Sequence, residues 1–103
     1  MERQELTIRQ LAERVRRGDE VATSALRLEL QDRLAARVRH VLRTGMQSSR
    51  LAKVIKRELD RLTDDGEQPD RAVQVVADEL CTCCIEQVRS GHLTGGFLET
   101  VVS

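Results

Sequence analysis

Three cysteines lie within four positions of the segment ELCTCCIEQV, residues 79–88, and the chain has no other cysteine. Cys81 and Cys84 have the Cys-x-x-Cys spacing that occurs in zinc sites and in redox motifs. A zinc site needs about four converging ligands, usually two short pairs separated by a loop, and a second pair is lacking. His92 is the only imidazole nearby. Cys81, Cys84 and His92 are therefore the metal candidates, for an ion shared between subunits.

Helical geometry favours a simpler interpretation of the cysteines. A redox motif lies at a helix N-terminus, where the dipole lowers the thiol pKa, whereas these cysteines fall inside an expected helix. At 100° per residue Cys84 falls at the centre of the apolar face, with Cys81 and Cys83 on its shoulders. The apolar arc, which includes Ile85, spans about 200°, as in a central helix. We interpret the cluster as core residues, with no cofactor; a shared metal or an intersubunit disulfide are the alternatives.

The composition indicates a helical bundle with a thin core. Phe97 is the only aromatic residue among 103, so the interior must be built from Leu, Val, Ile and Ala. Such a core, in a chain with 33% charged residues, raises the chance that a partner chain completes it. No run approaches the about 18 apolar residues of a membrane span, and the first residues lack the apolar core of a signal peptide. We expect a cytoplasmic protein, and the odd number of clustered cysteines agrees with a reducing compartment.

The net charge of zero conceals a strong asymmetry along the chain. Residues 1–62 carry 15 basic and 9 acidic side chains, a net charge of +6. Residues 63–103 carry 2 basic and 8 acidic side chains, a net charge of −6. This split is consistent with charge pairing between helices of one bundle, with an anionic partner for the first part, or with complementarity between subunits.

Helix signals are strong in the first half of the chain. Thr7 and Gln10 have capping-box spacing, and Gly18 is a natural helix stop. Asp19 is a good N-cap for a second helix, which Gly45 ends. Apolar residues recur at the helical period between these signals. We predict helices over residues 7–17 and 20–44.

The second half of the chain predicts two further helices and a tail. Ser48 or Ser49 caps the third helix, and Asp70 caps the fourth, which Gly91 ends. The two helices are expected over residues 49–62 and 70–90, joined by a flexible loop over 63–69 that holds Asp-Gly and the only proline. Residues 91–103 are too few for another substantial helix, so we expect an extended tail, as a short strand or a partner-binding arm. The prediction is an all-α fold: one four-helix bundle over residues 1–103.

The stretch LAERVRRGDEVATSALRLELQDRLAARVRHVLRTG, followed by SSRLAKVIKRELDRL, resembles region 2 of extracytoplasmic-function sigma factors of the sigma-70 class. In that family a helix ends in Arg-x-Gly-Asp-Glu, and a second helix rich in Arg and Leu leads to a third. The resemblance covers residues 8–62 and implies a helical, transcription-related domain. The family's acidic polymerase-docking stretch is replaced by LAKVIKRE, and its promoter-opening aromatic residues are missing before Phe97. The resemblance therefore assigns no functional residue here.

Two classes of function follow from these patterns, and catalysis is not among them, because the sequence has no Gly-rich phosphate loop, nucleophile elbow or paired His and carboxylate at ligand spacing. We expect a non-enzymatic helical interaction module, an adaptor, small chaperone or regulatory subunit, that forms a homo-oligomer or binds a helical protein. The alternative is nucleic-acid binding through two basic helices. The interface candidates are Leu28, Cys81, Cys83, Ile85, Phe97 and Leu98. The nucleic-acid candidates are Arg33, Arg37, Arg43, Arg50, Lys53, Arg57 and Arg61.

Overall fold

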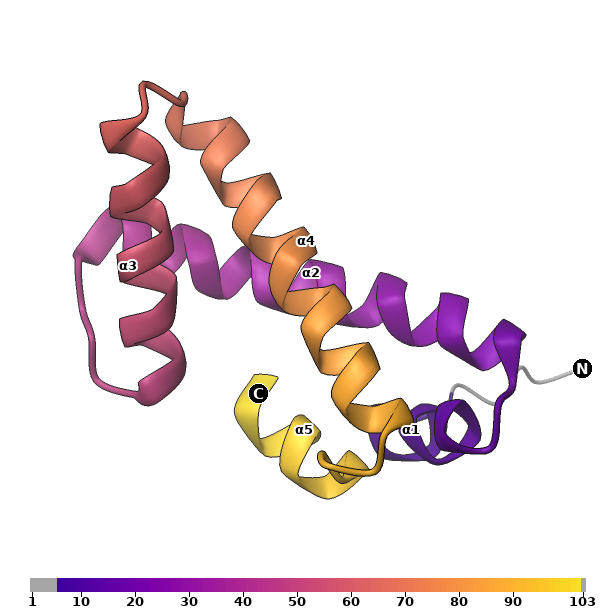
Figure 1. Ribbon diagram of the computed structural model, residues 1–103. Helices are drawn as coiled ribbons and strands as arrows, with labels where there is room; N and C mark the ends of the chain where they lie inside the picture. The colour runs from indigo at the N-terminus through magenta and orange to yellow at the C-terminus, as the bar shows by residue number, and fades with distance from the viewer. Residues whose placement is uncertain (1–5, 103) are drawn as a thin grey trace, which may run out of the picture.

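The computed structural model describes residues 6–102, which fold into helices without a strand in that range (Figure 1). The two longest helices, α2 and α4, cross near their middles (Figure 1). Helices α1 and α5 pack together at one end of this crossing, and α3 packs at the other end. The expected all-α fold is confirmed. The helices are α1 (Ile8–Arg16), α2 (Glu20–Thr44), α3 (Arg50–Asp64), α4 (Pro69–Arg89) and α5 (Gly95–Val102).

The capping signals of the first two helices act as the sequence predicts. The Thr7 hydroxyl accepts a hydrogen bond from the Gln10 amide, and the Gln10 side chain accepts one from the Thr7 amide. The Asp19 carboxylate accepts from the Ala22 amide at 3.1 Å. Gly45 ends α2 in the left-handed conformation, with φ of 69°, which costs little without a side chain. None of the helices within residues 6–102 has the length and apolar character to cross a bilayer.

The boundary between α3 and α4 differs from the prediction. Ser49 caps α3 as one of the two expected residues, but the helix continues through Asp64. Helix α4 begins at Pro69, with Gln68 at the N-cap, so Asp70 lies in the first turn and is not the cap. Proline suits the first helical position because its fixed φ is helical and its missing amide hydrogen is not needed there. The expected loop over 63–69 therefore shrinks to residues 65–68.

Residues 95–102 form a helix, so the prediction of an extended tail or strand over 91–103 is wrong there; residues 91–94 form the connection from α4, and Ser103 lies outside the described residues. The Thr94 hydroxyl accepts from the Phe97 amide, and Leu98 and Val102 are buried one turn apart. Gly95 lies directly against α1, where a Cβ atom would be 2.9 Å from the carbonyl oxygen of Arg9. Packing on α1 therefore stabilises a helix that is too short to be stable alone.

The core consists of two clusters of buried aliphatic residues. The first is formed by α1, the N-terminal half of α2, the C-terminal half of α4 and α5. The second is formed by the C-terminal half of α2, α3 and the N-terminal half of α4. Leu51 and Leu80 are partly buried and pack against both clusters.

The molecule is more open than a compact globule of its size. Its radius of gyration is 14.4 Å, against about 13 Å for a compact domain of 100 residues. Its accessible surface is 7162 Å², whereas a compact monomer of 11.7 kDa exposes about 5,900 Å².

Candidate functional site

The three cysteines have three different environments, and they differ from the predicted ones. Cys81 is fully buried and donates a hydrogen bond to the carbonyl oxygen of Arg27 at 3.4 Å. Cys84 is half-buried, and Cys83 is exposed. Cys81, rather than Cys84, is therefore the core cysteine. The reason is that the buried side of α4 rotates along the helix, from α3 in the first half to α1, α2 and α5 in the second.

The structure does not bring the metal candidates together. Among residues 6–102 no three His, Cys, Asp or Glu side chains converge in a way that would hold a metal ion. His92 lies beyond the end of α4, where its Nδ1 atom is 2.7 Å from the Ser90 hydroxyl. Burial raises the pKa of the Cys84 thiol to about 11, and burial also raises the pKa of Cys81. Both thiols are therefore protonated at neutral pH, whereas metal ligands and redox nucleophiles are thiolates.

The interface candidates divide into buried and exposed residues. Leu28 is 68% exposed on α2, Phe97 is 60% exposed on α5, and Cys83 is exposed on α4. The other three are core residues, so their prediction as interface residues is wrong. Their side chains are buried in the first core cluster, where a partner cannot contact them. These residues are Cys81, Ile85 and Leu98.

The nucleic-acid candidates also fall into separate groups. Arg50, Lys53 and Arg57 are exposed on one side of α3, and no acidic side chain in residues 6–102 pairs with them within 4 Å. Arg61 is held by Glu58 at 2.7 Å, which raises the pKa of its guanidinium. The α2 candidates lie elsewhere: Arg33 beside Glu29, Arg37 in a cavity of about 110 Å³ at the α2–α3 junction, and Arg43 in the last turn of α2.

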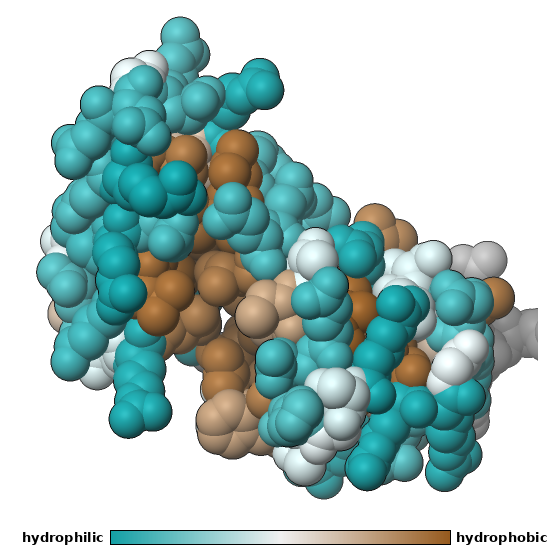
Figure 2. Space-filling model, viewed as in Figure 1, coloured by the Kyte–Doolittle hydropathy of each residue, from teal (hydrophilic) through white to brown (hydrophobic). Residues whose placement is uncertain are grey.

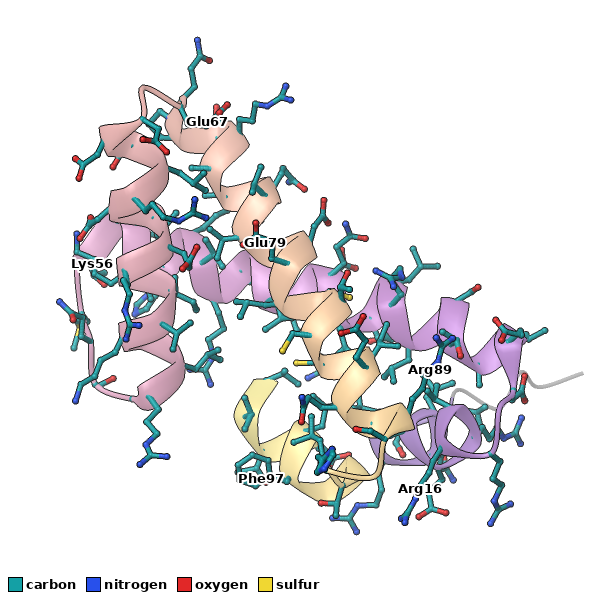
Figure 3. All side chains as sticks on the ribbon, in the orientation of Figure 1. Arg16, Lys56, Glu67, Glu79, Arg89 and Phe97 are labelled. Carbon is teal, nitrogen blue, oxygen red and sulfur yellow. The ribbon has the colours of Figure 1, made fainter. Side chains whose placement is uncertain are left out.

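An apolar hollow lies where α3 and α4 diverge, with α5 at its open end. Figure 2 shows hydrophobic side chains gathered along this hollow, between hydrophilic surfaces on either side. Val54 of α3 is 39% exposed, and the Phe97 ring projects from the side of α5 that faces away from α1 (Figure 3). We call this surface the apolar hollow and assign to it the partly buried or exposed apolar residues of the three helices that border it: Leu51 and Val54 of α3, Leu80 and Cys84 of α4, and Phe97 and Val101 of α5.

Charges of opposite sign flank the apolar hollow. On α3, Val54 adjoins a basic strip of Arg50, Lys53 and Arg57, which we call the α3 ridge. On α4, the exposed side carries an acidic strip, which we call the α4 ridge. The α4 ridge consists of Asp78, Glu79 and Glu86, which line a shallow patch together with Thr82 and Cys83.

The sequence contained a partial signal for this surface. Phe97 is one of the predicted interface residues; it is 60% exposed, and its interface role stays a prediction. Val54 is not among the predicted interface residues, although Arg50 and Arg57, four positions before it and three after it, are its neighbours on the helix surface. Val101 was assigned to an extended tail. No family model matches this sequence, and neither the curated proteins nor the solved structures contain a match to it.

Proposed function

We propose that this protein is a non-enzymatic helical protein–protein interaction module that acts as a homo-oligomer, with the apolar hollow as its contact surface. The observation that carries the proposal is the exposure of Phe97, the only aromatic residue of the chain, at the edge of a hollow of aliphatic side chains. Aromatic residues are enriched at protein interfaces relative to the rest of the surface.

The size of the uncovered surface supports association. Burial of apolar surface contributes about 25 cal/mol per Å², so covering Phe97 and Val54 on two protomers contributes several kcal/mol in total. That amount offsets part of the about 4–15 kcal/mol that association costs in lost translational and rotational freedom. The remaining stabilisation has to come from burial of the half-buried residues of the hollow. The partner's surface must therefore be complementary in shape to the hollow along its length.

Sedimentation equilibrium or light scattering on the full chain tests this proposal. We expect the wild-type protein to form a defined oligomer at concentrations near about 10 µM. Phe97→Asp places a charge in the hollow and should weaken association at least tenfold. Val21→Asp is the control, because Val21 is also an exposed apolar residue but lies at the start of α2, outside the hollow and outside the interface candidates. A wild-type monomer up to about 100 µM would overturn the proposal.

A second candidate function rests on the α3 ridge. Its three basic side chains are unpaired within residues 6–102, and the resemblance of residues 8–62 to region 2 of sigma factors is consistent with a contact to nucleic acid. Three phosphate contacts predict a slope of about −3 for the logarithm of the affinity for duplex DNA against the logarithm of salt concentration. Lys53→Ala and Arg57→Ala should each reduce that slope by about one. A salt-independent or absent interaction would eliminate this candidate.

A further inference from the structure

We infer that the partner in the hollow is a second copy of this chain, related by a two-fold axis, with the α3 ridge of each protomer against the α4 ridge of the other. This inference rests on the proposed function and specifies its partner and geometry. It follows from the order of surfaces across one face of the molecule. Hydrophilic surfaces border the apolar hollow on both sides (Figure 2); the residues of the α3 ridge are basic and those of the α4 ridge are acidic.

The order of α3 ridge, hollow and α4 ridge is complementary to its own copy for only one orientation of the two-fold axis. If the axis runs along the hollow, the rotation exchanges the two sides, so each basic ridge faces an acidic ridge. If the axis runs across the hollow, each ridge faces its own copy, and like charges are opposed. Charge therefore selects the axis along the hollow, while apolar contact across it supplies the attraction.

The lengthwise positions of the charges agree with this axis. Helices α3 and α4 both extend from their short connection toward the same end of the molecule, with opposite chain directions (Figure 1). Figure 3 shows Glu79 of α4 level with the middle of α3, where Lys56 is labelled. A rotation about the axis along the hollow leaves each residue's position along that axis unchanged. Glu79 therefore meets the middle of the partner's α3, and Glu86 meets its N-terminal half. The basic residues Arg57 and Lys53 occupy those two positions.

Most charges of the ridges are available for such contacts, whereas Asp78 accepts a hydrogen bond from the Gln31 side chain of α2. Lys53 and Arg57 form no ion pair within residues 6–102, and the same holds for Glu86. Glu79 lies near Arg61, whose guanidinium pKa it helps to raise, but Arg61 already pairs with Glu58. Exposed ion pairs contribute little affinity, so their role in the dimer is to fix orientation and to exclude other pairings.

Paired charge reversals test this geometry. Lys53→Glu with Arg57→Glu makes both ridges acidic, and Glu79→Lys with Glu86→Lys makes both ridges basic. Each double variant alone should dimerise at least tenfold more weakly than the wild type. An equimolar mixture of the two should form a heterodimer, because both intersubunit contacts then regain opposite charges. The combination of all four changes in one chain should likewise restore the homodimer.

The control is Arg14→Glu with Arg39→Glu, which changes the net charge as much as the α3 reversal but lies on α1 and α2. It should leave dimerisation unchanged, and circular dichroism at 222 nm should show that every variant is folded. A wild-type dimer that the ridge reversals do not weaken, or a mixture without heterodimers, would overturn the inference and leave the proposed function standing. Species that grow beyond the dimer would also overturn it, because they require head-to-tail contacts. A wild-type monomer would overturn the proposed function itself.

Discussion

Leu51 of α3 and Leu80 of α4 both pack against the two halves of the core, so they join what would otherwise be two separate aliphatic clusters. Both residues are only partly buried, because they also line the apolar hollow. The partner proposed for the hollow would therefore cover the residues that hold the two halves together. The proposal thus predicts that association stabilises the α2–α4 crossing.

Leu80→Ala should lower the free energy of unfolding, because Leu80 joins the two core clusters. Truncating a buried leucine costs about 2–5 kcal/mol, and partial exposure places Leu80 near the lower end, at about 2 kcal/mol. The measurement is chemical denaturation followed by circular dichroism, since the chain has no Trp or Tyr to report by fluorescence. Leu62→Ala is the matched control, because Leu62 is also partly buried but packs against the second cluster alone. Equal losses for the two variants would show that Leu80 has no joining role.

The cysteines give a second prediction, which differs from the one that the helical wheel suggests. Cys81→Ala should cost about 1–2 kcal/mol, because it removes a fully buried sulfur and its hydrogen bond to Arg27. Cys84→Ala should cost less than that, because Cys84 is half-buried at the edge of the hollow. Denaturation midpoints of the two variants decide between the orders. A larger loss of stability for Cys84→Ala than for Cys81→Ala would show that Cys84 lies at the centre of the core.

The difference between these two orders shows what the sequence could and could not predict. The starts and ends of α1 and α2 follow from local hydrogen bonds, as at Thr7, Asp19 and Gly45, so short sequence signals were sufficient. The buried side of α4 depends on where that helix crosses α2. A helical wheel assigns one buried face to the whole helix and therefore cannot predict this tertiary property. For the same reason α5 was missed, since it depends on the fit of Gly95 against Arg9.

The pKa of Cys84 predicts a loss of stability in alkaline solution. Burial raises this pKa to about 11 in the folded state, whereas an unfolded cysteine titrates near about 8.5 to 9. Between these values the unfolded chain releases the thiol proton and the folded chain keeps it. The free energy of unfolding should therefore fall as the pH rises from about 9 to 11, by up to about 2 kcal/mol from this group.

Comparison with Cys84→Ala isolates that contribution, because the variant lacks the titrating thiol. Its stability should change less over the same pH range, and the two curves should be parallel below about pH 8. Parallel curves throughout would mean that the Cys84 thiol is not protected from ionisation. Alkylation at neutral pH gives an independent check: Cys83 should react first, Cys84 slowly, and Cys81 only on unfolding.

The docking of α5 on α1 gives the last prediction. At Gly95 a Cβ atom would lie 2.9 Å from the carbonyl oxygen and 3.0 Å from the Cα atom of Arg9, which are backbone atoms that cannot move aside easily. Gly95→Ala should therefore displace α5 and cost about 1–3 kcal/mol. At Gly96 the nearest atom is the end of the flexible Arg9 side chain, at 3.1 Å. Gly96→Ala should be neutral or stabilising, because alanine favours the helix by about 1 kcal/mol over glycine.

Thermal unfolding of the two variants measures this difference, and hydrogen exchange of the α5 amides locates it. Gly95→Ala should increase the exchange of residues near Leu98, whereas Gly96→Ala should leave their protection intact or improve it. Because α5 carries Phe97 into the hollow, Gly95→Ala should also weaken self-association without any change to a contact residue. If both variants were equally stable, the close approach of α5 to α1 would not be what holds the last helix in place.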